Sequence, residues 1–250
     1  MADLTTSIPA VRESVAAVFR LRQTKPATVK KGKQRPAQFQ FSWGSAFSVV
    51  TDRYLLTAFH VLNGGQTRDP QDKFYVLTVP GNGLPFFTFP VVAFPLERQD
   101  LDMAVLEVGP CANGAAHLPG LPVSFAGHPD GTRVVTVGFP APEVAGLNVD
   151  PQGTFQGGQF FLKSHANEGI VSARYDLGPA NVPVYELNVG WHHGESGGPV
   201  ATLADQPAAF TLMQHYRNIQ GPHGILPGPH RGCALSTIQQ DLRALGVTVV

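Results

Sequence analysis

The chain has 250 residues, of which 43% are hydrophobic and 14% are charged, and its 18 basic side chains balance 18 acidic ones. This length can bury a sizeable core, and all-β barrels often reach it within one domain. The balanced charge gives no reason to expect binding to nucleic acid or to a membrane surface.

The N-terminus and the cysteines bear on the compartment. Asp3 stands where a signal peptide would carry basic residues, and no long apolar run follows, so neither export nor a membrane-spanning segment is expected. Cys111 and Cys233 are too few for a disulfide framework and fit a reducing environment. A cytoplasmic location is therefore expected.

The first elements are a helix, a strand and a basic loop. Residues 7–13 predict a short helix, with Ser7 as its N-cap and Pro9 in its first turn. A strand is expected over residues 15–21. Residues 20–35 hold seven of the 18 basic residues and no acid. A solvated hairpin loop is the favoured interpretation; the alternative, a docking patch for an acidic partner or nucleic acid, lacks interleaved aromatic side chains.

Two adjacent strands, predicted over residues 39–50 and 54–58, lead directly to His60. A strand end holds a side chain rigidly, and imidazole titrates near neutrality, so His60 is a candidate general base. Residues 67–98 contain five prolines, which predict short strands joined by turns.

Two candidate acids follow, Asp100 and Asp102, which would face the same side of an extended segment.

Residues 109–121 are expected to form the linker that connects the two halves of one folded unit. Residues 221–230 are expected to form a loop, since they contain two Gly-Pro-His turns. Further strands are predicted over residues 133–137, 157–163, 169–175, 182–189 and 210–215.

Ser196 lies on a glycine-rich turn after the last of the long strands, where a substrate can approach the backbone closely. Such a turn alone does not indicate a catalytic site. With His60 and Asp102 it supplies a nucleophile, a base and an acid in the chain order His, Asp, Ser that chymotrypsin-type enzymes use.

The chain resembles the trypsin-like (chymotrypsin-fold, S1-type) serine peptidases, and within them the bacterial branch similar to the protease domain of the HtrA/Deg enzymes. The resemblance covers about residues 12–248. Seven segments carry it in the family's order: Gly44-Ser45-Ala46-Phe47, Leu56-Thr57-Ala58-Phe59-His60-Val61, Asp102-Met103-Ala104-Val105-Leu106, Val137-Gly138-Phe139-Pro140, Gly169-Ile170-Val171-Ser172, Gly194-Glu195-Ser196-Gly197-Gly198-Pro199 and Gly232-Cys233-Ala234-Leu235-Ser236.

This resemblance implies an all-β fold of two six-stranded antiparallel β-barrels with a short C-terminal helix. Ser236 is the expected N-cap of that helix and Gly246 its C-cap. One peptidase domain is expected over residues 1–250, with the first barrel at about 12–108, the linker at about 109–121, the second barrel at about 122–234 and the helix at about 236–245.

The resemblance also assigns roles to the site residues. Ser196 would attack the scissile carbonyl, His60 would act as general base and then general acid, and Asp102 would orient His60. The backbone N–H groups of Gly194 and Ser196 would form the oxyanion hole. Water would hydrolyse the acyl-enzyme, so no cofactor is expected.

The pocket for the substrate's first side chain is expected at Gly190, Trp191 and His215. Gly190 stands where an enzyme selective for Lys or Arg would have aspartate, so that preference is not supported. His215 would favour an acidic side chain, and a neutral or small apolar preference is an equal alternative. The adjacent His192 and His193 would point to opposite faces, so no metal site is expected.

One departure from the animal digestive relatives is Glu195, which replaces their aspartate; no sequence for activation by N-terminal insertion is present. The expected function is that of a bacterial serine endopeptidase with protein or peptide substrates that are restricted or regulated by a partner protein. A catalytically silent peptide-binding module is the alternative from another class. An effector that cuts one partner protein is a third interpretation.

Overall fold

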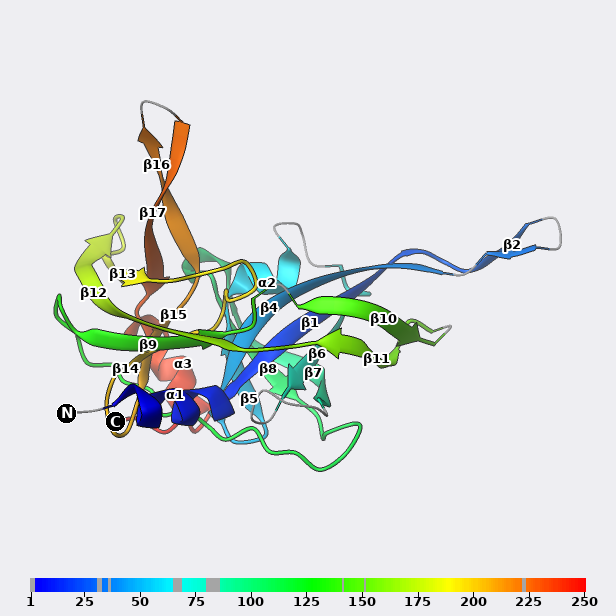
Figure 1. The fold of residues 1–250 in the computed structure, drawn as a ribbon, viewed down its shortest axis with the longest axis horizontal. Coiled ribbons are helices and arrows are strands. Elements are labelled where there is room, and N and C mark those ends of the chain that lie inside the picture. The colour runs from blue at the N-terminus through cyan, green and yellow to red at the C-terminus, as the bar shows by residue number, and fades with distance from the viewer. Residues whose placement is uncertain are drawn as a thin grey trace.

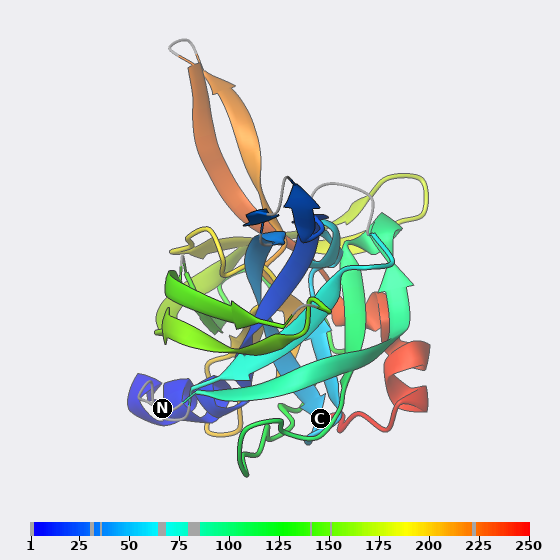
Figure 2. The ribbon, with the colours of Figure 1, turned by 90° about the vertical axis from the view of Figure 1, so that its right-hand side faces the viewer.

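The computed structural model describes residues 3–30, 33–35, 37–64, 69–79, 86–140, 142–150, 152–221 and 224–250. Most of the chain forms antiparallel strands in two large sheets, and two hairpins project from the body (Figure 1). In a view turned by 90°, the orange hairpin rises from the top of the molecule and the dark blue one points toward the viewer, so the two project in different directions (Figure 2).

The first sheet is a closed six-stranded barrel in the order β1-β4-β5-β8-β7-β6. Its strands are long apolar runs, and seven consecutive residues of β1 are buried. The strands are β1 (Val15–Lys25), β4 (Gln38–Val50), β5 (Tyr54–Thr57), β6 (Lys73–Thr78), β7 (Phe87–Arg98) and β8 (Met103–Val108).

The second sheet has seven strands in the order β15-β14-β9-β12-β13-β17-β16 and is open. The expected all-β fold of the chymotrypsin type is confirmed, but this sheet curls into a half-barrel of seven strands instead of the expected six-stranded barrel. Within the described residues, an isolated bridge pairs Thr211 of β15 with Ala234, which follows β17. The strands are β9 (Arg133–Gly138), β12 (His165–Leu177), β13 (Val182–Val189), β14 (Pro199–Thr202), β15 (Ala209–Leu212), β16 (His215–Gly221) and β17 (Gly224–Cys233).

The remaining elements are two small hairpins and short helices. They are β2 (Thr28–Lys30), β3 (Lys33–Arg35), β10 (Glu143–Val149), β11 (Phe155–Phe161), α1 (Leu4–Glu13), α2 (Phe59–Asn63), α3 (Gln239–Ala244), and the 3₁₀ helices η2 (Gln99–Leu101) and η3 (Leu235–Ile238). Among the described residues, no helix has the length and apolar character needed to cross a membrane.

The core consists of two clusters. The larger one fills the barrel and reaches the second sheet, with Phe19, Phe47 and Leu106 fully buried. The smaller one surrounds Tyr185 and Phe210, whose rings meet edge to face at 4.9 Å. The barrel therefore provides a rigid base for the turns that follow β5 and precede β8.

Both predicted N-caps are wrong. Asp3 caps α1 by accepting a hydrogen bond from the Thr5 N–H at 3.2 Å, and this helix starts before the predicted residue 7. Ser7 is buried instead, and its hydroxyl donates to the carbonyl of Ala204 at 2.8 Å. At the C-terminal end, Ser236 lies inside η3, which has no side-chain cap.

Three predicted segments differ in form. Residues 224–233 form β17 rather than a loop, because they pair with β13 and β16. β7 is one long strand with register shifts, although residues 80–85 of the same proline-rich stretch lie outside the described residues. The basic stretch is a solvated loop only in part, since β1 extends to Lys25 and Arg20 is buried.

Candidate active site

His60 and Asp102 form a direct pair through two hydrogen bonds. The backbone N–H of His60 donates to Asp102 Oδ1 at 2.9 Å, and His60 Nδ1 lies 2.8 Å from Asp102 Oδ2. His60 is the second residue of α2, just past the end of β5, rather than the last residue of a strand. Two bonds to one carboxylate fix the orientation of the imidazole and the nitrogen that carries its proton.

Asp102 occupies an unusual backbone conformation, with a φ of 52°. Such a left-handed residue other than glycine is uncommon and needs support from its surroundings. Its carbonyl accepts hydrogen bonds from the Phe59 N–H at 3.2 Å and from Gln214 Nε2 at 2.9 Å. Asp100 pairs with Arg98 instead and has no bond to His60.

Gln214 joins the second sheet to the aspartate loop of the barrel. Its side chain is 2% exposed, and its Nε2 also donates to the carbonyl of Leu101 at 2.6 Å. Its Oε1 accepts from the Cys233 N–H at 2.7 Å. Every polar atom of this buried amide is therefore bonded. Sequence reasoning missed this role, because Leu101 and Asp102 lie more than a hundred residues away along the chain.

The segment before Ser196 forms a tight turn. The Glu195 N–H donates to the His192 carbonyl at 3.1 Å, and Gly194 between them has a φ of 101°. A positive φ at the third position is the requirement of a type II turn, which glycine meets without strain. Within the described part of the chain, the N–H groups of Gly194 and Ser196 donate to no protein acceptor.

The Glu195 side chain folds back to hold this turn. It is 2% exposed, and its Oε2 accepts from the His192 N–H at 2.7 Å while Asn167 Nδ2 lies 3.5 Å from its Oε1. Burial raises the pKa of the Glu195 carboxyl, and the bond from the His192 N–H offsets part of that rise. The carboxylate thus closes the turn by a local hydrogen bond.

Ser45, a fully buried residue of β4, connects the turn to the barrel. Its hydroxyl donates to the Gly194 carbonyl at 2.7 Å and accepts from the Phe139 N–H at 2.9 Å. Its N–H donates to the Ser196 carbonyl at 2.7 Å. A polar side chain within an apolar strand was the signal in the sequence that could have identified it.

Gly197 brings the serine close to the histidine segment. A Cβ on Gly197 would lie 2.1 Å from the Ser45 carbonyl oxygen and 2.9 Å from the Ala58 nitrogen, two residues before His60. Only glycine permits this approach. Ser196 itself is 7% exposed, and within the described residues no hydrogen bond joins its hydroxyl to His60.

The three expected pocket residues have different surroundings. Gly190 is exposed, and Trp191 packs against the smaller core cluster with its ring 5.5 Å from those of His193 and His230. His215 is the first residue of β16 and is exposed. Their part in a substrate pocket stays a prediction.

Cys233 and the histidines raise the question of a second nucleophile or a metal site. Burial raises the pKa of the Cys233 thiol to about 11, so it is protonated at neutral pH and a poor nucleophile. Among the described residues, no group of three or more His, Cys, Asp or Glu side chains could hold a metal ion.

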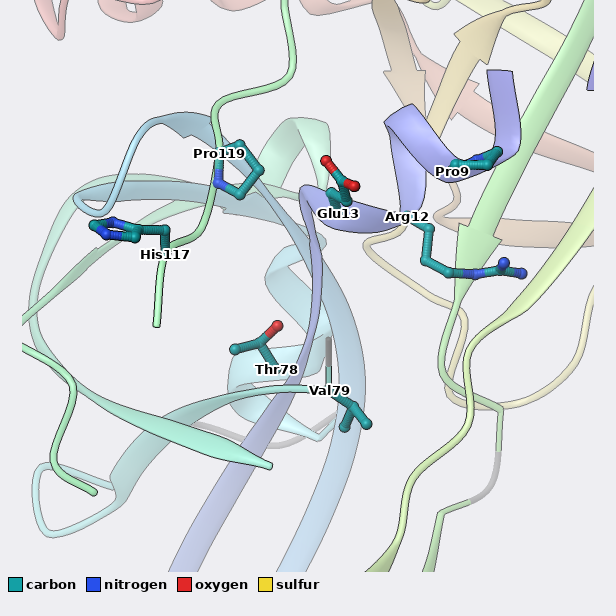
Figure 3. A pocket seen from close by; sticks show the side chains of 7 residues that line it. All are labelled: Pro9, Arg12, Glu13, Thr78, Val79, His117 and Pro119. Carbon is teal, nitrogen blue, oxygen red and sulfur yellow. The ribbon is translucent and has the colours of Figure 1, made fainter. Parts of the chain in front are cut away.

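A well-defined cavity lies elsewhere (Figure 3). It measures about 450 Å³ and lies between α1, the end of β6 and the linker. It is lined by Pro9, Arg12, Glu13, Thr78, Val79, His117 and Pro119. None of the residues discussed above lines it, so this cavity does not mark the candidate site.

Three comparisons relate the chain to known proteins. The family described as trypsin-like peptidase domain matches residues 44–206. No curated protein matches the chain significantly. Among solved structures, an HtrA-type protease, AlgW with a decapeptide, is similar with a TM-score of 0.64 and 14% identity over 97% of this chain and 67% of that chain. Deg5 is similar with a TM-score of 0.57 and 14% identity over 92% and 87%. At these identities the two structures show a shared fold alone.

Proposed function

The chain belongs to the family of trypsin-like peptidase domains, and from this premise we propose that it is a serine endopeptidase acting through Ser196, His60 and Asp102. The observation that carries the proposal is the His60–Asp102 pair beside the serine turn. Its carboxylate binds both the backbone and the ring of His60. A peptide bond in a protein or peptide is the proposed substrate.

In the proposed reaction, Ser196 Oγ attacks the scissile carbonyl carbon as His60 Nε2 takes the hydroxyl proton. Asp102 stays ionised, accepts the Nδ1–H and stabilises the imidazolium. When the C–N bond breaks, the imidazolium gives its proton to the leaving amine. Water then attacks the acyl-enzyme with His60 again as base, which releases the acid and regenerates Ser196.

The turn that ends at Ser196 supports a preformed oxyanion hole. The type II geometry at Gly194, together with N–H groups that have no protein acceptor, suits two donors aimed at a developing negative charge. Loss of one such donor typically costs about 100-fold to 1,000-fold in turnover. Glu195 and Ser45 hold the turn without an inserted N-terminus.

Three further expectations belong to the proposal. One peptidase unit comprises both sheets, since the larger core cluster contains residues from each. Substrate side chains enter at Gly190, Trp191 and His215. The protein works in the cytoplasm, on substrates that are restricted or controlled by a partner protein.

One observation favours the alternative of a catalytically silent module. The described residues include no hydrogen bond between Ser196 and His60. Catalytic hydrogen bonds are often long in the absence of substrate, so the lack of a bond between these two side chains does not exclude turnover. The two candidates differ in the reactivity of Ser196.

Reaction with a fluorophosphonate tests the proposal directly. We expect one covalent adduct by intact mass on the wild type and none on Ser196→Ala, because only an assembled triad and oxyanion hole activate the serine. Labelling should rise with pH as an imidazole loses its proton. A folded wild type without an adduct would support the silent module instead.

A further inference from the structure

Basic charge is concentrated in one part of the chain. Residues 14–51 include seven basic side chains and no acid. Two of the seven are used internally: Arg22 forms two bonds of 2.7 Å to Asp72, and Arg20 lies 3.7 Å from the same buried carboxylate. The other five all lie within residues 23–38.

These five residues give the molecule an uneven charge. Without them, the 18 basic residues fall to 13 against 18 acidic ones, a net charge of −5 for the rest of the chain. Lys25, Lys33 and Arg35 are exposed, and within the described residues their side chains have no hydrogen bond or ion pair. Their charge is therefore available to a partner.

The basic arm, meaning residues 23–30 and 33–35, projects away from the barrel (Figures 1 and 2). It consists of the end of β1 and of the hairpin formed by β2 and β3. Within the described residues, β2 and β3 pair only with each other. Val29 is 71% exposed, and Lys30 pairs directly with Lys33. A two-stranded ribbon without a core is marginal. Its packing therefore does not stabilise the fold.

Both outer edges of this ribbon are open to strand addition. An edge rich in lysine repels another copy of itself and accepts a strand that carries acidic side chains. Nucleic acid fits less well, because the arm lacks aromatic side chains for stacking and the rest of the chain is negative. In Figure 1, α2, which contains His60, lies between the base of this arm and the β16–β17 hairpin.

We propose that the basic arm binds an acidic segment of a polypeptide substrate as an extended chain, while another part of the same substrate lies at Ser196. This inference rests on the proposed function and adds a substrate class to it. Each strand of the hairpin has three residues, which at about 3.3 Å per residue gives about 10 Å of binding edge, and Lys25 lies three residues before β2. Because the arm projects from the barrel, the acidic segment binds away from the scissile bond.

Binding can be measured without knowledge of the cleavage site. In the Ser196→Ala background, fluorescence anisotropy would compare a labelled peptide of about 20 residues rich in Asp and Glu with its Asn and Gln counterpart and with single-stranded DNA of similar length. The test variant is Lys25→Gln/Lys33→Gln/Arg35→Gln. The control of equal charge change is Arg53→Gln/Arg133→Gln/Arg243→Gln, which alters exposed residues outside the arm.

We expect the acidic peptide to bind at least ~10-fold more tightly than the neutral one, and the arm variant to lose about 10-fold of that affinity, as three exposed ion pairs would give. The control should lose less than about threefold, and added salt should weaken binding. The inference would be overturned if both variants lost affinity equally or if the acidic peptide were not preferred. It would also be overturned if the arm bound DNA more tightly than the acidic peptide, or if the arm caused the protein to self-associate.

Fluorophosphonate labelling separates the two proposals. The arm variant should react at the wild-type rate, because the arm is not part of the catalytic machinery. If wild-type Ser196 fails to react while the acidic peptide still binds the arm, the proposed function fails and the binding site stands. If Ser196 reacts and the acidic peptide does not bind, the inference alone fails.

Discussion

At the scale of single residues, Gln214 shows how a side chain outside the triad can control its geometry. It bonds the carbonyls of Leu101 and Asp102 in the barrel and the Cys233 N–H in the second sheet. Because Asp102 has a strained backbone, these bonds support its position together with those from the Phe59 and His60 N–H groups. Gln214 is thus a positioning residue that acts on His60 through Asp102.

Gln214→Ala should slow fluorophosphonate labelling of Ser196 by about 10-fold or more, since three backbone groups at the junction of the sheet and the aspartate loop each lose a hydrogen bond. The midpoint of the pH profile of labelling should also fall, because the imidazolium loses part of its carboxylate contact. Rate constants measured from pH 5 to pH 9 test both effects.

Thr211→Val is the matched control, since Thr211 is buried in the same sheet and donates to the Cys233 carbonyl at 2.6 Å without touching the aspartate loop. It should lower Tm by a similar amount and leave the pH midpoint unchanged. An identical change of midpoint in both variants would assign Gln214 a structural role only.

At the scale of elements, the turn of residues 192–195 depends on a buried acid. The Glu195 carboxylate accepts the His192 N–H, and burial raises its pKa, so the ionised form carries a cost in the folded protein. A neutral side chain with the same acceptor would avoid that cost. The hydrogen bond, rather than the charge, holds the turn.

Glu195→Gln should therefore keep the rate of Ser196 labelling within about threefold and not lower Tm, because its amide oxygen replaces the carboxylate oxygen. Glu195→Ala keeps the Cβ and loses the hydrogen bond, so its labelling should fall about 10-fold or more. Labelling rates and thermal unfolding of the two variants decide this. Equal loss in both would show that the negative charge itself is required.

At the scale of the whole molecule, two histidines make folding sensitive to acid. Burial lowers the pKa of His128 and His230 below the ordinary value of 6.5. The unfolded chain therefore binds more protons than the folded one as pH falls through 6.5, and the free energy of unfolding decreases. Glu195 acts in the opposite direction, because its raised pKa lets the folded state take up a proton first.

Urea unfolding of Ser196→Ala at pH 7.5, 6.5 and 5.5 should show this loss of stability. His128→Phe should reduce it, because the His128 ring stacks 4.2 Å from Phe210, and its buried Nε2 has no hydrogen bond among the described residues. Thr211→Val, which removes a buried hydrogen bond but no titratable group, should leave the slope with pH unchanged. A slope unaffected by His128→Phe would remove His128 from the explanation.

The sequence alone determined the all-β class, most of the strands and the order of His60, Asp102 and Ser196. These features depend on local patterns: apolar runs, turn residues and motifs whose members are neighbours in the chain. The predicted caps at Ser7 and Ser236 failed, because capping depends on which residue first leaves the helical conformation. A tertiary contact took Ser7 into the interior.

Only the tertiary structure decided how the site is held together. Ser45 reaches Gly194 across 149 residues, and Gln214 reaches Leu101 across 113. No periodicity records such pairs, since each depends on how two sheets pack. The open second sheet and the projecting basic arm were likewise decided there, because strand order and the direction of a hairpin follow from packing between distant segments rather than from local preference.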